Sequence, residues 1–260
     1  MRIAHTRQAL REAVDPLRGG AIGLVPTMGA FHDGHRSLFA AARQECDAVV
    51  VSLFVNPAQF EEGADLDAYP RDLDADVAVA ETAGADVLFA PPVEEIYPPG
   101  FQTWVDVVEL GRRFEGEHRP GHFRAVATVC LKLFNLVRPR FAYFGQKDAQ
   151  QVAVLQRLIR DLDLELALRV LPTVRDSDGL ALSSRNARLS STEREQALTL
   201  PRALATRDAE RARAELAGLD VDYVEVLDLD PPVLAGAVRL GSTRLIDNVV
   251  LDPIHDRETA

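Results

Sequence analysis

The chain of 260 residues is long enough to bury a large core and to form one large or two modest domains. With 47% apolar residues and no apolar run as long as a membrane span, the composition argues against a membrane-spanning helix, and we expect a cytoplasmic protein. The net charge of -11 argues against nucleic acid as a partner, and it means that a site for an anionic ligand must gather its own cations.

The first predicted elements frame the most informative stretch of the sequence. Thr6 to Arg18 has the apolar spacing of an amphipathic helix, and the run from Ala21 to Val25 is typical of a buried strand. A further helix is predicted over Ser37 to Arg43. The stretch from Pro26 to His35, P-T-M-G-A-F-H-D-G-H, therefore lies at a strand-to-helix turn.

This turn has the features of a phosphate-binding site. Gly29 and Gly34 would let the backbone approach a ligand closely, and a helix that begins near His35 would point its unpaired N–H groups and positive dipole end toward an anion. His32 and His35 can face the same phosphate group and stabilise charge that develops during phosphoryl chemistry. Two histidines in a glycine-containing turn also fit an ordinary surface loop, so this stretch alone does not decide the function.

A second strand end carries polar side chains. The β-branched run from Ala48 to Val55 is typical of a strand buried on both faces of a parallel sheet. Asn56 and Gln59 follow it, at the carboxyl end where open α/β sheets bind their ligands. The acidic segment from Glu61 to Asp76 is predicted to be a solvated loop and the acidic first turn of a helix that runs to about Ala83, and we assign it no metal site.

The middle of the chain is predicted to add two strands and a polar loop. Ala85 to Ala90 has the pattern of a buried strand, and Thr103 to Val108 alternates like a half-exposed one. The polar stretch from Arg112 to Phe123 is expected to be a solvent-exposed loop, although Arg119 and His122 in it could reach a carboxylate substrate.

The next segment indicates a buried helix. Ala125 to Val137 is apolar nearly all round, with Lys132 extending its ammonium group toward solvent. Cys46 and Cys130 lie in apolar patterns and match no metal or redox spacing, so we expect both to be reduced core residues.

A third motif follows another strand. Phe141 to Phe144 is a short apolar run that leads directly into Gly145 to Asp148, G-Q-K-D. A long amphipathic helix up to Asp161 and a strand from Leu164 to Leu171 come next. Because strands and helices alternate, we predict a right-handed, Rossmann-like, doubly wound parallel sheet, with the three motifs on one rim.

The pattern changes after Pro172. Thr173 to Asn186 is polar and loop-like, Ser190 to Glu193 has the sequence of a capping box that opens a helix, and three short strands are predicted from Val221 onward. We therefore predict a first domain over residues 1–173 and a small α+β domain over residues 174–260.

These motifs supply the parts that adenylation of a carboxylate needs. The carboxylate attacks the α-phosphate of ATP and pyrophosphate leaves, so the protein acts mainly by positioning and by placing cations and N–H groups around the triphosphate. Lys147 would neutralise the leaving pyrophosphate, and Asp148 could accept hydrogen bonds from ribose hydroxyls. Ser183, Ser184 and Arg185 could close over the other side, although this sequence also fits a capped turn.

The ordered series H-x-G-H at 32–35, G-Q-K-D at 145–148 and L-S-S-R-N at 182–186 resembles the pantothenate synthetase family, the pantoate:β-alanine ligases of the nucleotidylyltransferase-like group. The resemblance implies a homodimeric Mg²⁺-ATP enzyme that makes a bound pantoyl adenylate. The amine of β-alanine then attacks this adenylate, giving pantothenate, AMP and pyrophosphate. The resemblance also implies that Gln59 contacts pantoate and β-alanine, that Gln151 contacts pantoate and that His35 is the proton donor.

The same resemblance implies further residue roles. Those that bind ATP would be Met28, Gly29, Ala30, Phe31, His32, Asp33, Gly34, His35, Gly145, Gln146, Lys147, Asp148, Val174, Leu182, Ser183, Ser184 and Arg185. The catalytic residues would be His35, His32, Lys147, Ser183, Ser184 and Arg185, and no metal ligand is assigned. The chain departs from the family where Gln146 replaces Glu and Leu182 replaces Met, and we expect ATP binding to survive both changes. The region from Leu200 to Asp220 is also shorter than is usual in the family.

Two other functions fit parts of the sequence. A nucleotidylyltransferase would transfer AMP to a phosphate-bearing small molecule and would need cations for that phosphate, whereas Gln59 and Gln151 are neutral groups suited to hydroxyls and a carboxylate. An RNA-binding relative of a synthetase catalytic domain is disfavoured by the acidic charge of the chain.

Overall fold

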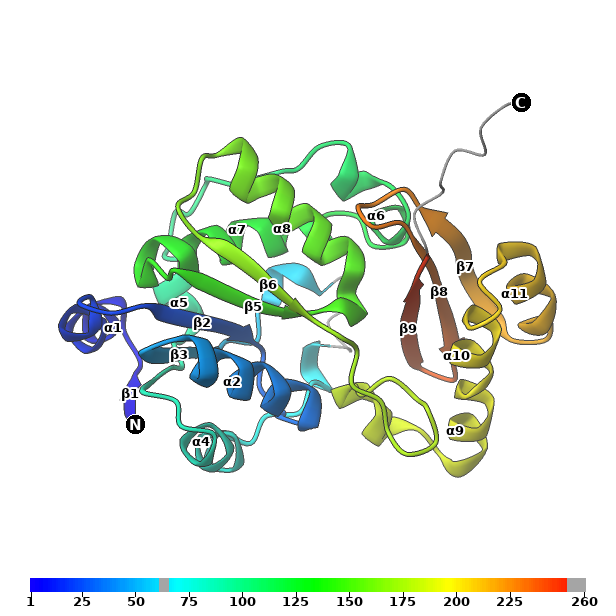
Figure 1. Cartoon of the computed structure of the whole chain (residues 1–260), viewed down its shortest axis with the longest axis horizontal. Helices are drawn as coiled ribbons and strands as arrows, with labels where there is room; N and C mark the ends of the chain where they lie inside the picture. The colour runs from blue at the N-terminus through cyan, green and yellow to red at the C-terminus, as the bar shows by residue number, and fades with distance from the viewer. Residues whose placement is uncertain (61–65, 252–260) are drawn as a thin grey trace.

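The computed structural model describes residues 1–60 and 66–251, and the strands within them form two sheets (Figure 1). The larger sheet has six parallel strands in the order β1-β4-β3-β2-β5-β6, and the smaller has three antiparallel strands in the order β7-β8-β9. The strands of the larger sheet are β1 (Arg2–Ala4), β2 (Ile22–Thr27), β3 (Ala48–Leu53), β4 (Val87–Phe89), β5 (Phe141–Gly145) and β6 (Ala167–Leu171). The predicted acidic segment from Glu61 to Asp65 and the predicted domain's residues 252–260 lie outside the described residues.

Helices cover both faces of the six-stranded sheet, as the doubly wound prediction requires. On one face, α1 (Arg7–Val14), α7 (His122–Val137) and α8 (Ala149–Asp161) enclose an apolar core with Leu24 and Val50. On the other face, α2 (Asp33–Glu45) and α4 (Leu73–Thr82) pack against Val25, Val49 and Val51. Strands β2 and β3 therefore contribute side chains to both cores, which explains their continuous apolar runs. Cys46 and Cys130 are buried and free, as predicted.

The chain leaves the middle of the sheet in two directions. After β2, the chain adds β3 and β4 on one side of β2, and it later adds β5 and β6 on the other side. The strands β2 and β5 are therefore neighbours in the sheet from which the chain continues in opposite directions. A crevice forms at such a switch point, outside the carboxyl ends of the strands, and it is where open α/β sheets bind ligands. The turn after β2 and the Gly145–Asp148 motif after β5 flank this point.

Two predictions for the middle of the chain were wrong. Thr103 to Val108 forms no strand, although its alternation is real: Val105 and Val107 pack against the core while Trp104 and Val108 are exposed. The stretch 112–123 is not a solvent-exposed loop, because it contains the short helix α6 (Glu115–His118) and the buried Glu115 and His122. The sequence reading also missed β1 and the short helix α5 (Val93–Ile96).

The C-terminal sheet is built from longer strands than predicted. β7 (Asp220–Leu227), β8 (Val233–Leu240) and β9 (Thr243–Val250) have 8 residues each. Helices α9 (Ser191–Ala197), α10 (Thr199–Leu204) and α11 (Ala209–Glu215) pack on one face of this sheet, and α9 begins with the predicted Ser190–Glu193 capping box. The short region between Leu200 and Asp220 contains α11, whose N-terminus is capped by the side chain of Asp208.

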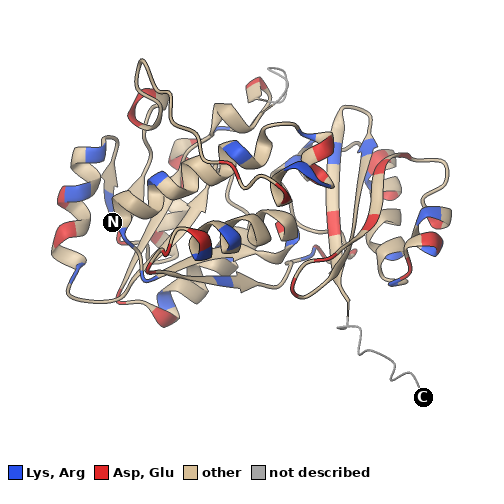
Figure 2. Ribbon diagram, turned by 90° about the horizontal axis from the view of Figure 1, so that it is seen from above, with Lys and Arg blue, Asp and Glu red and all other residues tan. Residues whose placement is uncertain are grey.

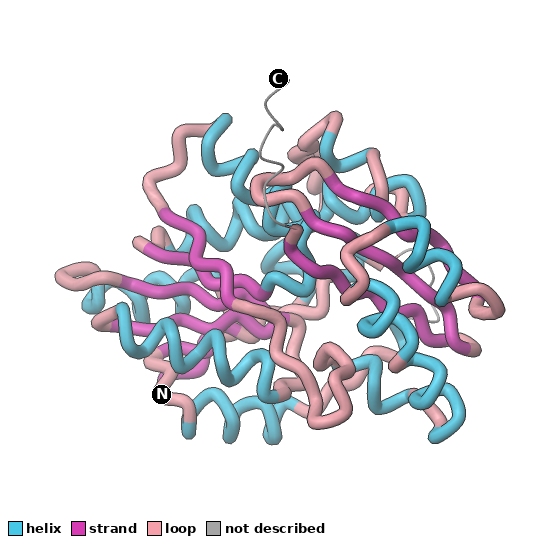
Figure 3. The backbone as a smooth tube through the Cα atoms, turned by 45° about the vertical axis from the view of Figure 1, so that its right-hand side comes forward, coloured by secondary structure: helices cyan, strands magenta, loops and turns pink. Residues whose placement is uncertain are grey.

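The second face of the small sheet packs against the first part of the chain. Tyr223, Val233 and Ala235 contact a cluster that includes Phe114 and Ala149, so the two sheets lie next to each other (Figures 1 and 3). In Figure 2, basic and acidic residues are interspersed along the helices of both parts. No helix in the described part of the chain is long and apolar enough to cross a membrane.

Candidate active site

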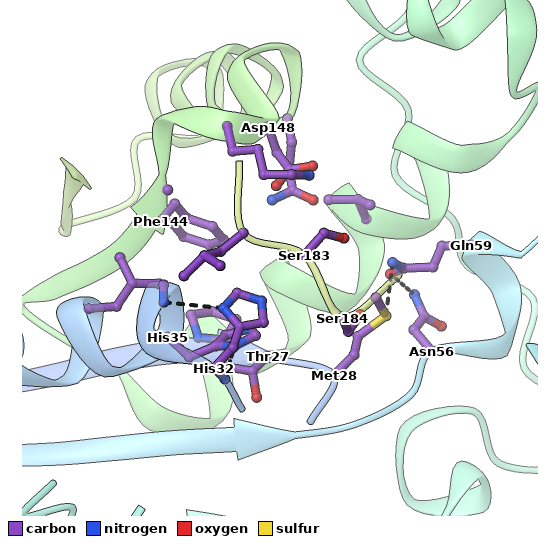
Figure 4. A pocket seen from close by; sticks show the side chains of 18 of the residues that line it. Thr27, Met28, His32, His35, Asn56, Gln59, Phe144, Asp148, Ser183 and Ser184 are labelled. Atoms are coloured by element: carbon purple, nitrogen blue, oxygen red, sulfur yellow. Dashed lines mark hydrogen bonds between the residues drawn. The ribbon is translucent and has the colours of Figure 1, made fainter. Parts of the chain in front are cut away.

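A cavity of about 250 Å³ lies at the carboxyl ends of β2, β3, β5 and β6. Most of the residues predicted from the sequence to contact ligands line it: Met28, His32, Gly34, His35, Gln59, Gly145, Lys147, Asp148, Gln151, Val174, Leu182, Ser183, Ser184 and Arg185. Figure 4 shows His32 and His35 side by side, Asp148 opposite them, and Gln59, Asn56 and Met28 together at one end.

Five residues of the predicted ATP-binding set are not among those that line the cavity: Gly29, Ala30, Phe31, Asp33 and Gln146. The first three build the turn instead. Asp76 on α4 accepts hydrogen bonds from the backbone N–H of Ala30 at 2.9 Å and of Phe31 at 2.8 Å, and the Phe31 ring packs against His35. Asp76 lies in the acidic first turn of a helix, as predicted, but its side chain is only 3% exposed, which the sequence pattern did not indicate. Its partners are far away in the sequence, which is why the charge pattern did not indicate them.

The first prediction concerns this buried carboxylate. Asp76→Ala leaves the N–H groups of Ala30 and Phe31 without their acceptor, and each unsatisfied buried donor costs about 1–3 kcal/mol. We expect a loss of about 2–5 kcal/mol in the free energy of unfolding, measured by urea denaturation. Asp76→Asn keeps one acceptor oxygen and should lose less. Equal stability of Asp76→Ala and the parent protein would contradict this account.

Gly29 shows how closely the turn approaches Asp76. Its φ is +88°, which favours glycine, and a Cβ atom there would lie 2.7 Å from Oδ2 of Asp76. The glycine is therefore required by the backbone conformation and by this contact.

The two histidines form the start of α2. His32 is the N-cap and His35 is the third residue of the helix, so the helix begins at Asp33 rather than near His35 as predicted. Nδ1 of His35 accepts the backbone N–H of His32 at 3.3 Å, and Nδ1 of His32 accepts the N–H of Gly34 at 3.1 Å. Since both Nδ1 atoms act as acceptors, each neutral ring carries its proton on Nε2. The motif thus supplies two imidazole N–H donors to the wall of the cavity.

The surroundings keep both rings neutral. Burial, then the positive charge of Lys147, lowers the pKa of His32, although Asp33 and Asp148 oppose this effect. Burial, His32 and Lys147 together lower the pKa of His35 from 6.5 to about 3. His35 is therefore an uncharged hydrogen-bond donor at neutral pH.

Lys147 and Asp148 lie on a single 3₁₀ turn, Gln146–Asp148, directly after β5. The buried Asn248 of β9 supports this turn from behind: its Nδ2 donates to the backbone oxygens of Gln146 at 3.0 Å and Lys147 at 2.8 Å. The Gln146 side chain lies 3.4 Å from Oδ1 of Asn248. The replacement of Glu by Gln at 146 therefore falls outside the cavity wall.

The opposite end of the cavity is rich in neutral polar groups. Asn56 donates to Oε1 of Gln59 at 3.1 Å, and Nε2 of Gln59 contacts the Met28 sulfur at 3.1 Å. The backbone oxygen of Gln59 accepts from Arg119 at 3.0 Å and from Nδ1 of His122 at 3.1 Å. Asn56, Arg119 and His122 all line the cavity, so the alternative that Arg119 and His122 reach a ligand fits the structure better than an exposed loop.

His122 leads to a prediction about stability and pH. Burial and the neighbouring Arg119 lower its pKa from 6.5 to about 4, so in the folded protein it stays neutral where the unfolded chain binds a proton. Its contribution to stability is complete above pH 6.5 and is lost as the pH falls toward 4. Between pH 7 and pH 5, we expect the free energy of unfolding to fall by about 2 kcal/mol more in the parent protein than in His122→Gln, as measured by urea denaturation. His5→Gln, which replaces an exposed histidine, is the control, and an equal effect there would refute the assignment.

The loop after β6 forms the remaining wall. The N–H of Leu182 donates to the backbone oxygen of Val174 at 3.0 Å, and Ser183 caps the 3₁₀ helix Ser184–Arg188. The Ser184 hydroxyl donates to Tyr69 at 3.4 Å, and burial raises the pKa of that phenol. Val174, Leu182, Ser183, Ser184 and Arg185 are thereby brought to one side of the cavity.

The fold and the site together define a class. A parallel sheet with a cavity at its switch point, an H-x-G-H turn at a helix N-terminus and a lysine on the neighbouring strand end are the features of a nucleotidylyltransferase-like α/β protein. Comparison with known proteins specifies it further.

The model of the pantoate-beta-alanine ligase family matches residues 2–250. Over 97% of this chain and all of the relative, the sequence is 52% identical to a pantothenate synthetase of Corynebacterium efficiens. A crystal structure of pantothenate synthetase from Thermus thermophilus superposes with a TM-score of 0.90 at 43% identity, covering 96% of this chain and 99% of that one. A pantoate-beta-alanine ligase from Francisella tularensis, complexed with beta-gamma ATP and beta-alanine, gives a TM-score of 0.87 at 35% identity, covering 97% and 99%. The chain belongs to the pantoate–β-alanine ligase family.

Proposed function

We propose that the protein condenses pantoate with β-alanine to pantothenate in an ATP-dependent reaction that passes through a pantoyl adenylate. One observation supports this best: a single cavity has hydrogen-bond donors suited to phosphate on one side and neutral amide side chains at one end. An oxygen of the pantoate carboxylate attacks the α-phosphorus, and the bond to the bridging oxygen breaks as pyrophosphate leaves with the electron pair. The β-alanine nitrogen then attacks the acyl carbon, AMP leaves, and the amine loses a proton.

In this proposal ATP binds at the side of the cavity that is lined by His32, His35 and Lys147. The Nε2–H groups of His32 and His35 donate to phosphate oxygens, and Lys147 neutralises charge that moves onto the leaving pyrophosphate. Asp148 accepts from the ribose hydroxyls, and Ser183, Ser184 and Arg185 contact the phosphates from the other wall. The residues of the predicted ATP set outside the cavity wall act by shaping the turns.

The amide end of the cavity receives the two substrates that carry no phosphate. Gln59 and Gln151 provide neutral donors and acceptors for the hydroxyls and carboxylate of pantoate. Arg119 lies beside Gln59 and offers a charge partner for the β-alanine carboxylate. Neutral groups at this end suit an unphosphorylated acid better than the phosphate-bearing acceptor of a nucleotidylyltransferase.

Magnesium fits this site as a companion of the nucleotide. Mg²⁺ in ATP-dependent enzymes keeps several waters and is held largely by phosphate oxygens, so ATP bound beside Lys147 would supply most of its ligands. No group of three or more metal-binding side chains occurs among residues 1–60 and 66–251. When bound, the ion would neutralise phosphate charge.

We also propose the domain division, location and assembly. Residues 1–173 bind ATP and pantoate, residues from 174 onward form a lid, and the protein works in the cytoplasm as a homodimer.

The segment from Thr103 to Val108 supports a second copy of the chain as partner. It alternates like a strand, pairs with no described strand and exposes 38% of Trp104 and 52% of Val108. Light scattering tests this: Val108→Lys should convert a dimer to a monomer, and a monomeric parent protein would reject it.

The experiment that tests the function follows pyrophosphate. With ATP and pantoate alone, we expect one equivalent per active site to be released in a burst, and addition of β-alanine should give steady turnover. Turnover that needs no amine, or that needs a phosphorylated acceptor, would contradict the proposal.

A further inference from the structure

Two neighbouring residues of β9, outside the main cavity wall, hold two of the segments that form it. Asp247 and Asn248 are 3% and 5% exposed, and neither is among the residues that line the cavity of about 250 Å³. Both side chains are polar and buried, so their partners must account for their presence.

Asn248 holds the lysine turn. Both carbonyls that it binds, those of Gln146 and Lys147, belong to the turn that carries the Lys147 ammonium group into the cavity. One Nδ2 group thereby uses both of its hydrogens on this turn. An aspartate at 248 would lack these donors, and a leucine would leave both carbonyls without them.

Asp247 holds the loop on the other wall. Arg175 binds its carboxylate through two contacts, at 2.7 Å and 3.0 Å, in the bidentate geometry that gives strong, directional pairing. Arg175 pairs with Ala181 in an antiparallel bridge, directly before Leu182 and Ser183. The carboxylate of Asp247 therefore fixes the base of the hairpin that leads into Ser183, Ser184 and Arg185.

We propose that Asp247 and Asn248 are positioning residues of the adenylation step, through which the C-terminal sheet sets the distance between Lys147 and the Ser183–Arg185 loop. The inference rests on the proposed function, because it assumes that both segments contact the triphosphate. Misplacing a catalytic group by about 1 Å can cost on the order of 10²-fold in rate, so supports of this kind matter even without substrate contact.

The test is a double-mutant cycle on pyrophosphate release. Asn248→Leu should slow release by about 10- to 100-fold and raise the KM for ATP while leaving the KM for pantoate unchanged. On a Lys147→Ala background the same substitution should cost less than about 3-fold, because the group that it positions is already absent. Asp247→Asn acts through the other loop, so its effect should persist on that background. Equal effects of Asn248→Leu on both backgrounds would overturn the proposal.

Controls separate positioning from stability. Val249→Ala removes packing from the face of β9 opposite to Asn248, so as a control for Asn248→Leu it should lower the Tm without changing the rate of adenylation. Asn248→Ser keeps one donor and should recover part of the activity. If Asn248→Leu and Asn248→Ser both fail to fold, the residue is structural and the proposal is rejected. A parent protein that releases no pyrophosphate would reject the proposed function, whereas an active parent with a fully active, folded Asn248→Leu variant would reject only this inference.

Discussion

Replacing Lys147 with alanine is expected to slow adenylation by about 10²- to 10³-fold, the usual cost of removing one donor to a developing anion. The lysine lines the cavity and lies close enough to His32 and His35 for its charge to lower the pKa of both rings. Pyrophosphate carries the charge that develops in this step, so a cation here acts on the transition state more than on bound ATP. The measurement is single-turnover pyrophosphate release with ATP and pantoate.

The second half-reaction provides the internal control for Lys147→Ala. Supplied with pantoyl adenylate and β-alanine, the variant should form pantothenate at nearly the parent rate, because pyrophosphate has already left. Lys132→Ala, which removes a lysine placed over the Phe101 ring away from the cavity, should leave both half-reactions unchanged. Equal losses in both half-reactions would show that Lys147 serves the structure of the turn.

The arrangement of the sheet could be predicted because each of its main strands and helices has a recognisable local pattern of apolar residues. Val25, Val49 and Val51 belong to short apolar runs, and such runs alternating with helices leave few topologies for a chain of this length. The placement of ligand-binding candidates at strand ends then followed from a general property of parallel sheets. Thr103 to Val108 failed because alternation reports burial on one side and does not report a pairing partner.

The supports of the site could not be predicted in this way. Asp76 acts on a backbone N–H 46 residues earlier, and Asn248 acts on a carbonyl 101 residues earlier. Neither contact can be recognised from residue spacing or composition, so nothing in the sequence distinguished Asp76 or Asn248 from other polar residues of a helix turn or a strand. The burial of His122 was missed for a related reason: its Nδ1 binds the backbone oxygen of Gln59, which lies 63 residues earlier in the sequence.

A helix N-terminus disfavours a cationic imidazole, but burial is the main cause that lowers the pKa of His35. This has a consequence for the pH dependence of the reaction. A ring with a pKa of about 3 does not titrate between pH 5.5 and 9, so His35 should not set the pH dependence of adenylation in that range. We propose that it acts through its neutral Nε2–H as a hydrogen-bond donor; the family resemblance implies a proton donor, and the following variants distinguish the two roles.

We therefore expect His35→Ala to slow pyrophosphate release by about 10²- to 10³-fold, the cost of one lost donor. The fold should survive, because the side chain lies at the rim of the sheet and its loss removes one capping contact to His32, worth about 1 kcal/mol. His35→Asn retains an acceptor for that contact and a donor for phosphate, so it should recover part of the rate and keep the parent protein's pH profile. Rates from pH 5.5 to 9 for both variants, with circular dichroism as the check on folding, decide the matter. A profile that changes shape in His35→Asn would show that the imidazole titrates during the reaction, and near-parent activity in folded His35→Ala would remove the residue from the site.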